Sequence, residues 1–417
     1  MRTLLWRFLF CVALIAEVCD LAEAKTLCVN PGGTSGCFSK ITDAVAAASA
    51  HDTIKVASGS YSEDVVIGKP LSLVGDNRTN TIIDATGRAN GVYIDGIDHA
   101  DAREVVVTGF TVENANYEGI LVTNAAFVTI WGNRITGNDR SFNPAELSCP
   151  GIPTFETAED FDCGEGIHLS GVEHSTVANN EVRGNAGGIL LSDDTRATHH
   201  NLISGNISSE NPFDCGITLA SHPPALLTGA QAPLGVFDNT IAGNDVSKNG
   251  LKGEGAGVGI FDSVPGAKAY RNVVIGNKLT GNGLPGVALH SHTPGQNLNE
   301  NMIAANQISG NGADTDDAAT PGPTGINIFG VSPIVGTIVS QNIVKDEQVD
   351  IAVNTPAYVD VHLNDLLGKM VGLINLNGGR VNATENWWGC FRGPGAPGCS
   401  SVSGPNVLFT PWLTKPF

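Results

Sequence analysis

A pair of asparagines five residues apart recurs along the chain and constrains its fold more than any other feature. An aliphatic residue stands three positions before the first Asn of each pair, as Ile130 does before Asn133. After the pair come a Gly and an alternation of apolar residues, as in the sequence Gly-Ile-Leu-Leu that begins at Gly188. The pairs are Asn133/Asn138, Asn180/Asn185, Asn206/Asn211, Asn244/Asn249, Asn277/Asn282 and Asn306/Asn311. Because six copies share this pattern, the sequence indicates a repeat protein.

The alternation after each Gly predicts a short β-strand, because apolar residues at every second position line one face of a strand. Asn and Gly tolerate the left-handed backbone conformation that sharp corners need. The second Asn of each pair would stack above its copies and pass amide hydrogen bonds along a ladder. No helical periodicity lies between the strands, so crossover helices cannot join them. The chain is therefore predicted to wind as an all-β solenoid of roughly ten coils.

The spacing of the repeats favours one class of solenoid. Gly166 and Gly188 are 22 residues apart, and because 22 is not a multiple of six, the spacing argues against a left-handed hexapeptide helix. A right-handed parallel β-helix with coils of roughly 22 residues or more fits instead. Longer coils gain residues after the strand, at 220–235, and between the second Asn and the Gly, at 139–163 and 312–324. Insertions at equivalent corners predict loops that line up and form the binding side.

The first 24 residues differ from the repeats. Arg2 and Arg7 precede a short apolar run at 8–16, and Ala22 and Ala24 provide small residues suited to cleavage. This arrangement is typical of a secretory signal peptide, and the apolar run is too short to span a bilayer. We therefore expect residues 1–24 to be removed and the protein to be secreted or periplasmic.

Residues 25–417 are predicted to form a single β-helix domain with a cap at each end, because a solenoid needs caps to cover its open core. The N-terminal cap, 25–52, includes an Ala-rich stretch suited to a helix. The C-terminal cap, 386–417, includes Trp387 and Trp388 beside a predicted disulfide loop. For these tryptophans we favour a structural role in the cap over a sugar-stacking role.

Seven of the nine cysteines lie after residue 24, and their spacing predicts short-range disulfides formed in an oxidising compartment. The predicted pairs are Cys28–Cys37, Cys149–Cys163 and Cys390–Cys399. Cys215 is left over, and we favour a buried free thiol over a catalytic nucleophile.

The charge of the chain excludes some partners. Residues 25–417 carry 21 Lys and Arg and 39 Asp and Glu, a formal charge of −18, because the leader holds two of the 23 basic and three of the 42 acidic residues. A surface this negative repels nucleic acid and anionic lipid. It also argues against a polyanionic substrate unless a metal ion neutralises the contact. We expect a monomer that neither binds nucleic acid nor inserts into a membrane.

Three parts of the sequence together resemble a known family. They are the segment GCFSKITDAVAAASAHDTIKVASGSYSEDVVIGKPLSLVGDN, the Asn-pair repeats with their Gly-Ile-x-Leu strands, and the NWWG near the C-terminus. They resemble the pectin-lyase-fold superfamily of right-handed β-helices, including its NosD-like subgroup of parallel β-helix repeats. The resemblance implies the fold over nearly all of residues 25–417. The superfamily includes pectate and alginate lyases, polygalacturonases, pectin methylesterases, epimerases and copper-site-associated NosD proteins, so fold alone does not select an activity.

Counting from the Gly of each repeat places equivalent residues of neighbouring coils in columns with a spacing of about 4.8 Å. Acidic residues and histidines share three of these columns on four consecutive coils. The sequence predicts one patch of about 15 Å that contains Asp193, Asp194, His222, Asp262, His290 and His292. A His or Asp at a strand end is, taken singly, more often a turn residue that hydrogen-bonds backbone. As a set, they offer carboxylates and imidazoles for acid–base catalysis, or mixed ligands for a divalent metal.

A second candidate site lies one corner upstream. Glu118 and Glu165 each precede a repeat Gly, and His168 faces outward beside them. Carboxylates on adjacent coils would share a proton and provide the acid and the base of glycoside hydrolysis. The alternative is that they are solvated charges at the edge of the sheet.

These sites support three functional hypotheses. The first is a carbohydrate-active enzyme, a hydrolase, lyase or epimerase, that holds an extended extracellular glycan along the loop-lined face. The second is a non-catalytic, NosD-like metal-associated or ligand-binding protein with His222, His290 and His292 as ligands. The third is a structural surface protein without a site. The residues allow a divalent metal as cofactor, either calcium or, under the second hypothesis, copper or zinc.

Overall fold

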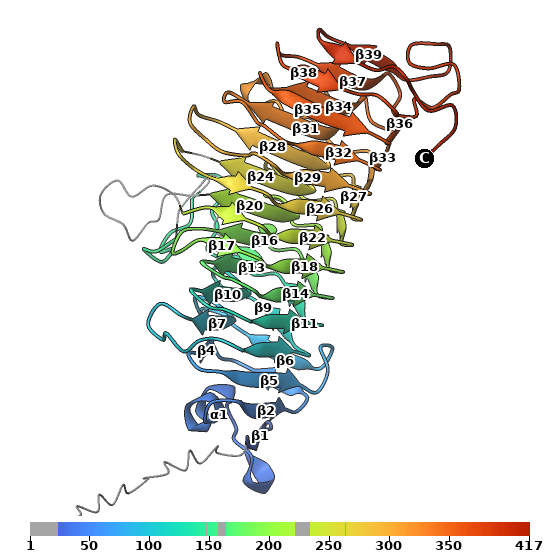
Figure 1. Ribbon diagram of the computed structural model, residues 1–417. Coiled ribbons are helices and arrows are strands. Elements are labelled where there is room, and N and C mark those ends of the chain that lie inside the picture. Colours follow the sequence, from blue (N-terminus) through green and yellow to red (C-terminus); the bar gives the residue numbers. More distant parts are fainter. Residues whose placement is uncertain (1–23, 147, 157–163, 222–233, 263) are drawn as a thin grey trace, which may run out of the picture.

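The computed structural model describes residues 24–417 except 147, 157–163, 222–233 and 263. Three long parallel sheets, which we call A, B and C, wind around one elongated core, and a short sheet D lies between sheets C and A (Figure 1). Each repeat adds a strand to sheet C, then to A, then to B, as β13 (Glu165–Ser170), β14 (Thr176–Ala178) and β15 (Glu181–Arg183) do. The predicted parallel β-helix is thus confirmed.

The strands of the four sheets have the following bounds. Sheet A contains β1 Thr26–Val29, β2 Asp52–Val56, β5 Leu71–Gly75, β8 Val106–Thr108, β11 Thr129–Trp131, β14, β18 Leu202–Ser204, β22 Thr240–Ala242, β26 Val273–Ile275, β29 Met302–Ala304, β32 Ile338–Ser340, β35 Tyr358–His362, β38 Arg380–Asn382 and β40 Val407–Leu408. Sheet B contains β3 Gly59–Tyr61, β6 Thr81–Asp84, β9 Thr111–Glu113, β12 Arg134–Thr136, β15, β19 Ile207–Ser209, β23 Asp245–Ser247, β27 Lys278–Thr280, β30 Gln307–Ser309, β33 Ile343–Lys345 and β36 Asp365–Leu367. Sheet C contains β4 Val65–Ile67, β7 Val92–Asp95, β10 Ile120–Thr123, β13, β16 Gly187–Ser192, β20 Ile217–Ser221, β24 Val258–Asp262, β28 Val287–Ser291, β31 Thr324–Gly330, β34 Val349–Asn354, β37 Val371–Asn375 and β39 Ser401–Ser403. Sheet D contains β17 Thr198–His199, β21 Val236–Phe237 and β25 Ala269–Tyr270.

The three long sheets have 14, 11 and 12 strands, so the helix has slightly more coils than expected. The additional coils lie at the two ends, where the Asn pair is incomplete and the repeat is harder to recognise. Aliphatic residues fill the interior, and equivalent positions such as Ile167, Ile189 and Ile217 are fully buried. Each such side chain contributes about 1.5–3 kcal/mol of hydrophobic stabilisation.

Buried asparagine ladders hold the corners together. The amide of Asn206 donates to the side-chain oxygen of Asn244 at 3.0 Å, and the amide of Asn244 donates to that of Asn277 at 2.9 Å. The ladder between sheets A and B consists of Asn133, Asn180, Asn206, Asn244, Asn277, Asn306, Asn342, Asn364 and Asn386. The ladder between sheets B and C consists of Asn138, Asn185, Asn211, Asn249, Asn282 and Asn311. The ladder predicted for the second Asn is confirmed, and the first Asn forms another.

A short helix and a C-terminal disulfide loop lie at the ends of the solenoid. Helix α1 (Ile41–Ala47) turns Ile41, Ala44 and Val45 into the end of the core. At the other end Trp388 is fully buried in the same core. Its burial agrees with the structural role that we favoured and leaves its indole no surface on which to stack a sugar.

The cysteines follow the predicted pattern where they are described. Disulfides join Cys28 to Cys37 and Cys390 to Cys399, which fits an extracytoplasmic protein. Cys149 is also disulfide-bonded, but its predicted partner, Cys163, lies outside the described residues. Cys215 is a buried free thiol, as expected, and its pKa is raised by burial and by the Asp214 carboxylate.

The part of the chain that the structure describes has no helix with the length and apolarity required to cross a membrane. The predicted signal peptide lies outside that part.

Candidate functional site

The outer face of sheet C carries His168 and His290, two of the side chains that the repeat pattern singled out. Residues alternate between the core and the outside along each strand, so those between the aliphatic positions face outward. The strand register places His168 in one outward column, beside Leu121 and Leu190. A second outward column contains Phe261 and His290 on neighbouring strands. Polar groups from these columns form two separate clusters.

The first group, which we call the His168 cluster, consists of Glu118, Glu156, His168, Ser192 and Asp194. All five are buried, and His168 is only 3% exposed. Glu118 precedes β10, His168 lies in β13, and Ser192 ends β16, so three adjacent coils contribute to the cluster. Glu156 comes from the insertion between the second Asn and the Gly.

A chain of hydrogen bonds fixes one side of the His168 ring. The Ser192 hydroxyl donates to Asp194 Oδ2 at 2.7 Å, and Nε2 of His168 lies 2.8 Å from Ser192 Oγ. Because the single hydroxyl proton is used for Asp194, Nε2 must carry the proton that it donates to Ser192. In the neutral ring the lone pair is then on Nδ1, which lies 3.8 Å from Glu118 Oε1.

The other ring nitrogen is unsatisfied. Among the described residues, neither Nδ1 of His168 nor Oε2 of Glu118 has a hydrogen-bond partner, although both are buried. Such groups are costly to bury without a partner and often indicate an absent ligand or a catalytic role. Donor atoms of Glu118, Glu156 and His168 lie within 4.8 Å of one another, so this trio is also able to hold a cation.

Residues 148–156 cover the cluster. The ring of Phe155 stacks on Tyr93 with 6.5 Å between ring centroids, and the Tyr117 hydroxyl donates to the backbone oxygen of Pro150 at 2.9 Å. These contacts attach the segment to the outer face of sheet C and place Glu156 beside His168.

Glu165, the third member of the second predicted site, is buried as well and lies in β13 opposite Gly187. The backbone N–H of Gly119 donates to the Glu165 carbonyl at 3.2 Å, which confirms that Glu118 and Glu165 stand on adjacent coils. The solvated-edge alternative is excluded for these residues, because both are only 1% exposed.

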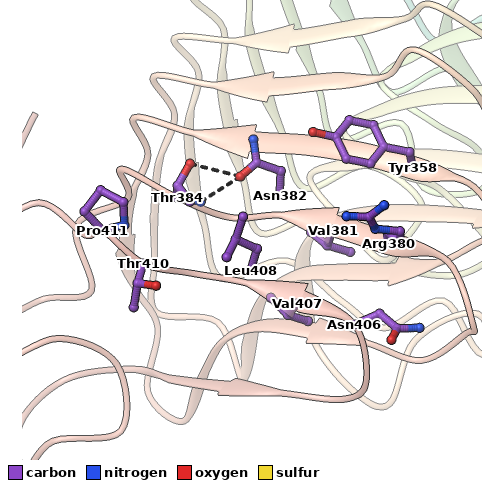
Figure 2. Close-up of a pocket in the computed structure, with 10 residues that line it drawn as sticks. All are labelled: Tyr358, Arg380, Val381, Asn382, Thr384, Asn406, Val407, Leu408, Thr410 and Pro411. Carbon is purple, nitrogen blue, oxygen red and sulfur yellow. Dashed lines mark hydrogen bonds between the residues drawn. The ribbon is translucent and has the colours of Figure 1, made fainter.

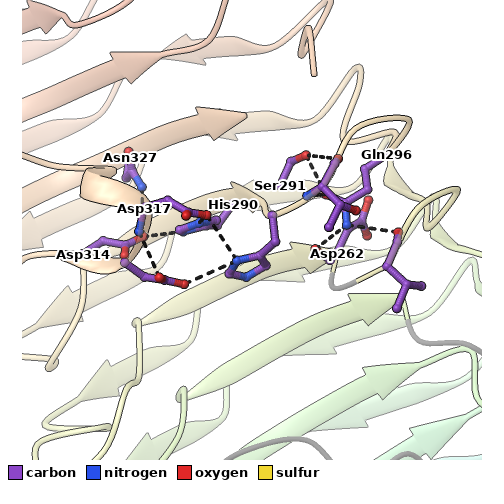
Figure 3. Close-up of polar contacts among 11 residues, drawn as sticks. Asp262, His290, Ser291, Gln296, Asp314, Asp317 and Asn327 are labelled. Carbon is purple, nitrogen blue, oxygen red and sulfur yellow. Dashed lines mark hydrogen bonds and ion pairs between the residues drawn. The ribbon is translucent and has the colours of Figure 1, made fainter. Parts of the chain in front are cut away.

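The second group, which we call the His290 cluster, consists of His290, His292, Asp314, Asp316 and Asp317. The histidines belong to β28 and the residue that follows it, and the carboxylates come from the insertion after Asn311. Figure 3 shows His290 beside Asp314 and Asp317. Nδ1 of His290 lies 2.7 Å from Asp314 Oδ2, and the two imidazole rings stack with 4.1 Å between centroids.

The two histidines of this cluster titrate in opposite directions. Burial acts to lower the pKa of His290, but the hydrogen bond with Asp314 and the nearby carboxylates outweigh it, so that pKa is raised. Burial and the charge of His290 lower the pKa of His292. As the pH falls, the buried ring of His290 is therefore protonated before that of His292.

The structure divides the single patch that the sequence predicted. Asp194 and His292 occupy the same column but lie three strands apart, a distance of about 14 Å. Small or apolar residues, among them Ala220 and Phe261, lie on the face between the two clusters. His222, which was predicted to connect the clusters, lies outside the described residues.

Two predicted members of the patch do not face outward. Asp193 and Asp262 are fully buried, because a residue five positions after the Gly has the same parity as the core-facing aliphatics. The carboxylate of Asp193 accepts hydrogen bonds from the Ser221 hydroxyl and the backbone N–H of Gly235. Asp262 lies on the opposite side of His290 from Asp314, next to Gln296 (Figure 3). The prediction that these two residues belong to an outward patch was wrong.

Comparison with known proteins places the fold in a family. The model described as "Right handed beta helix region" matches residues 73–265 and 154–308, which together span more than half of the chain. This chain belongs to the right-handed β-helix family. No curated protein sequence matches it.

Solved structures with the same fold are distant in sequence from this right-handed β-helix protein. The Dettilon tailspike protein gp208 is 13% identical with a TM-score of 0.52, covering 86% of this chain and 62% of its own. The surface adhesin PfbA of Streptococcus pneumoniae is 12% identical with a TM-score of 0.50, covering 82% of this chain and 86% of its own. The pectate lyase Pel9A is 14% identical with a TM-score of 0.45, covering 94% and 80%. This chain thus spans about three fifths of the tailspike protein, and the likeness concerns the fold alone.

Sequence reasoning missed several residues of both clusters. Glu156, Asp314, Asp316 and Asp317 belong to the insertions at 139–163 and 312–324, which the sequence did identify as loops on the binding side. Their conformation does not follow the repeat, so no column places them. The acidic sequence GADTDDAAT in the second insertion was the available signal.

A pocket of 740 Å³ lies elsewhere, on the last strands of sheet A (Figure 2). Its lining includes Tyr358, Arg380 and Leu408 and contains no histidine or carboxylate. It lies where β40 leaves the end of sheet A unpaired. We therefore place the candidate site on sheet C, where buried titratable groups converge.

Proposed function

We propose that this protein binds and processes an extended extracellular polysaccharide by acid–base catalysis at the His168 cluster. The observation that carries the proposal is the state of the His168 ring. Its Nε2 is fixed by Ser192 and Asp194, while its buried Nδ1 is turned toward Glu118 without a hydrogen bond among the described residues.

This arrangement suits proton transfer. A neutral imidazole whose Nε2–H is held by Ser192 presents its lone pair at Nδ1, and Glu118 lies 3.8 Å from that atom. A base and a neighbouring carboxyl group that face the same point of a bound substrate can remove one proton and supply another. Asp194 keeps the ring in one tautomer through Ser192 and stabilises the imidazolium that forms. Glu165, on the same strand as His168, is a further candidate carboxyl group.

The substrate class follows from the shape of the outer face and from the net charge. Strands that repeat every 4.8 Å present equivalent positions along a straight line, which suits a linear polymer. The chain has a formal charge of −19, so an uncharged glycan is favoured over an anionic one unless a cation is bound. Hydrolysis, elimination and epimerisation each use an acid–base pair of this kind.

The test compares a His168→Gln variant with the wild type over a panel of neutral and uronate-containing glycans, using reducing-end and unsaturated-uronate assays. We expect the rate on the active glycan to fall by at least about 100-fold. His362→Gln is the matched control, because His362 lies in β35 of sheet A, away from the cluster, and should keep the wild-type rate. Retained activity in the His168 variant would reject the proposed role. Binding of a glycan without turnover would favour the non-catalytic alternative.

A further inference from the structure

We propose that His290, His292, Asp316 and Asp317 bind one divalent transition-metal ion, such as zinc, at a site separate from the His168 cluster. Donor atoms of these four residues all lie within 4.8 Å of one another. The proposal concerns binding only and does not depend on any activity at His168.

The hydrogen bonds of His290 leave one ring nitrogen for a ligand. Asp314 Oδ2 accepts from Nδ1 of His290 at 2.7 Å, and the amide of Asn327 donates to the same oxygen at 3.2 Å. The backbone N–H of Asp314 also donates to the Thr320 hydroxyl at 2.9 Å, which orients the carboxylate. With the proton on Nδ1, the lone pair of Nε2 is directed at Asp317. A carboxylate that holds the outer nitrogen of a metal-binding histidine is the usual support of such ligands.

The remaining distances match shared coordination better than direct hydrogen bonds. In a tetrahedral site with metal–ligand bonds of about 2.0–2.2 Å, neighbouring donor atoms lie about 3.3–3.6 Å apart. His290 Nε2 lies 3.5 Å from Asp317 Oδ2, and His292 Nδ1 lies 3.4 Å from Asp316 Oδ2 and 3.7 Å from Asp317 Oδ2. Charge-assisted hydrogen bonds are about 2.7–2.9 Å long, the length that His290 does adopt with Asp314.

The local charge also calls for a cation. Three carboxylates surround two imidazoles, and within the described part of the chain the ion pairs of these carboxylates all involve His290 or His292. A dication bound by two imidazoles and two carboxylates would balance the negative charges of its carboxylate ligands, Asp316 and Asp317. Imidazole ligands favour zinc, copper or nickel over calcium and magnesium, which prefer oxygen alone.

The site is accessible from solvent. The side chains of His292, Asp316 and Asp317 are 34%, 53% and 44% exposed, whereas that of His290 is 2% exposed. The buried histidine therefore provides a fixed ligand and the three outer residues close around the ion.

A second histidine group provides an internal control. His174, His199 and His200 also bring donor atoms within 4.8 Å of one another, at the corner between sheets C and A. However, Nδ1 of His199 and Nδ1 of His200 are only 2.9 Å apart and hydrogen-bond to each other, which uses one of the lone pairs. Glu173 and Asp238 form ion pairs with Nε2 of His199 and His200 at 3.4 and 4.0 Å, but neither carboxylate belongs to the three-histidine group, so we expect this group to bind metal less tightly.

The experiment measures zinc binding to the purified, chelator-treated chain by calorimetry, and cobalt binding by visible absorption. We expect one equivalent of zinc and the intense absorption bands of tetrahedral cobalt. His292→Ala and Asp317→Asn should each weaken binding at least about 100-fold, and the side chains are 34% and 44% exposed, so these variants should fold. Asp314→Asn should weaken binding about 10–100-fold through the orientation of His290. His200→Ala should bind like the wild type.

Three results would overturn the site. These are absence of zinc binding by the wild-type chain, wild-type affinity in both His292→Ala and Asp317→Asn, and loss of binding in His200→Ala alone. Because metal binding is measured without any glycan, these results are independent of those that test the His168 cluster.

Discussion

The side-chain amide of Asn311 donates to the carboxylate of Glu347 at 3.0 Å, so Glu347 takes the next position in the ladder that runs from Asn138 to Asn311. The backbone N–H of Asn311 donates to the same group at 3.0 Å. Burial raises the pKa of Glu347 from 4.5 to about 6, although both hydrogen bonds act in the opposite direction. A titratable group therefore ends a ladder that is otherwise neutral.

The presence of Glu347 at the end of the asparagine ladder makes the stability of the folded chain depend on pH. Because the pKa of Glu347 is higher in the folded chain, its contribution is fully present below pH 4.5 and is lost as the pH rises through about 6. The difference corresponds to about 2 kcal/mol. We expect Glu347→Gln to raise the free energy of unfolding by about 1–2 kcal/mol at pH 8 and to leave it unchanged at pH 4, as measured by urea denaturation. Glu385→Gln, at an exposed position, should show no such difference. A less stable Glu347→Gln protein at pH 8 would contradict this account.

Replacement of an asparagine in the middle of the ladder should destabilise the fold far more than replacement of an exposed asparagine. Asn244 donates to Asn277 and to the Ile203 carbonyl, and its side-chain oxygen accepts from the backbone and side chain of Asn206. Asn244→Ala leaves these buried partners unsatisfied and should cost about 3–5 kcal/mol, since each lost partner costs about 1–3 kcal/mol. The loss appears as a lower midpoint in thermal or urea unfolding. The control is Asn80→Ala, at an exposed position, which should change stability by less than about 0.5 kcal/mol.

Helix α1 depends on a residue outside it. Its N-terminus has no side-chain cap of its own, but the Glu63 carboxylate accepts from the backbone N–H groups of Ile41 and Thr42 at 2.8 and 2.9 Å. We expect Glu63→Ala to cost about 1–2 kcal/mol and to increase amide hydrogen exchange across α1. Asp64→Ala, which changes the exposed neighbouring acid, should leave exchange unaffected. Equal protection of α1 in both variants would show that the cap is dispensable.

The sequence was sufficient for the architecture because the same short-range rules act on every coil. The Asn pairs determine where corners form, and the alternation around residues such as Ile189 and Leu191 determines which face is buried. Parallel stacking then follows, since neighbouring strands carry the same alternation of apolar residues. Glu63 shows the limit of such rules, because a cap supplied from a different coil leaves no local signal near α1.

The sites were predictable only where they follow the repeat. His168 and His290 occupy outward positions of the repeat strands; the columns identified His290, and the position of His168 beside the Glu118 and Glu165 pair identified His168. Asp193 and Asp262 were misplaced because the alternation continues for two residues past the last core-facing aliphatic, so the second of these side chains returns to the interior. The partners of the histidines, such as Asp314, lie in insertions whose conformation depends on contacts distant in sequence.

The segment over the His168 cluster provides a final prediction that needs no substrate. Phe155 holds residues 148–156 against sheet C through its stacking with Tyr93. In the wild-type chain His168, at 3% exposure, should resist acylation by diethyl pyrocarbonate, while His51, whose side chain is 61% exposed, should react readily. Phe155→Ala removes the stacking contact and should raise the modification of His168 at least several-fold without changing that of His51, as measured by peptide mass spectrometry. If His168 reacts as quickly in the wild type as in the variant, the segment does not control access to the ring. The polymer would then reach Nδ1 without displacing it.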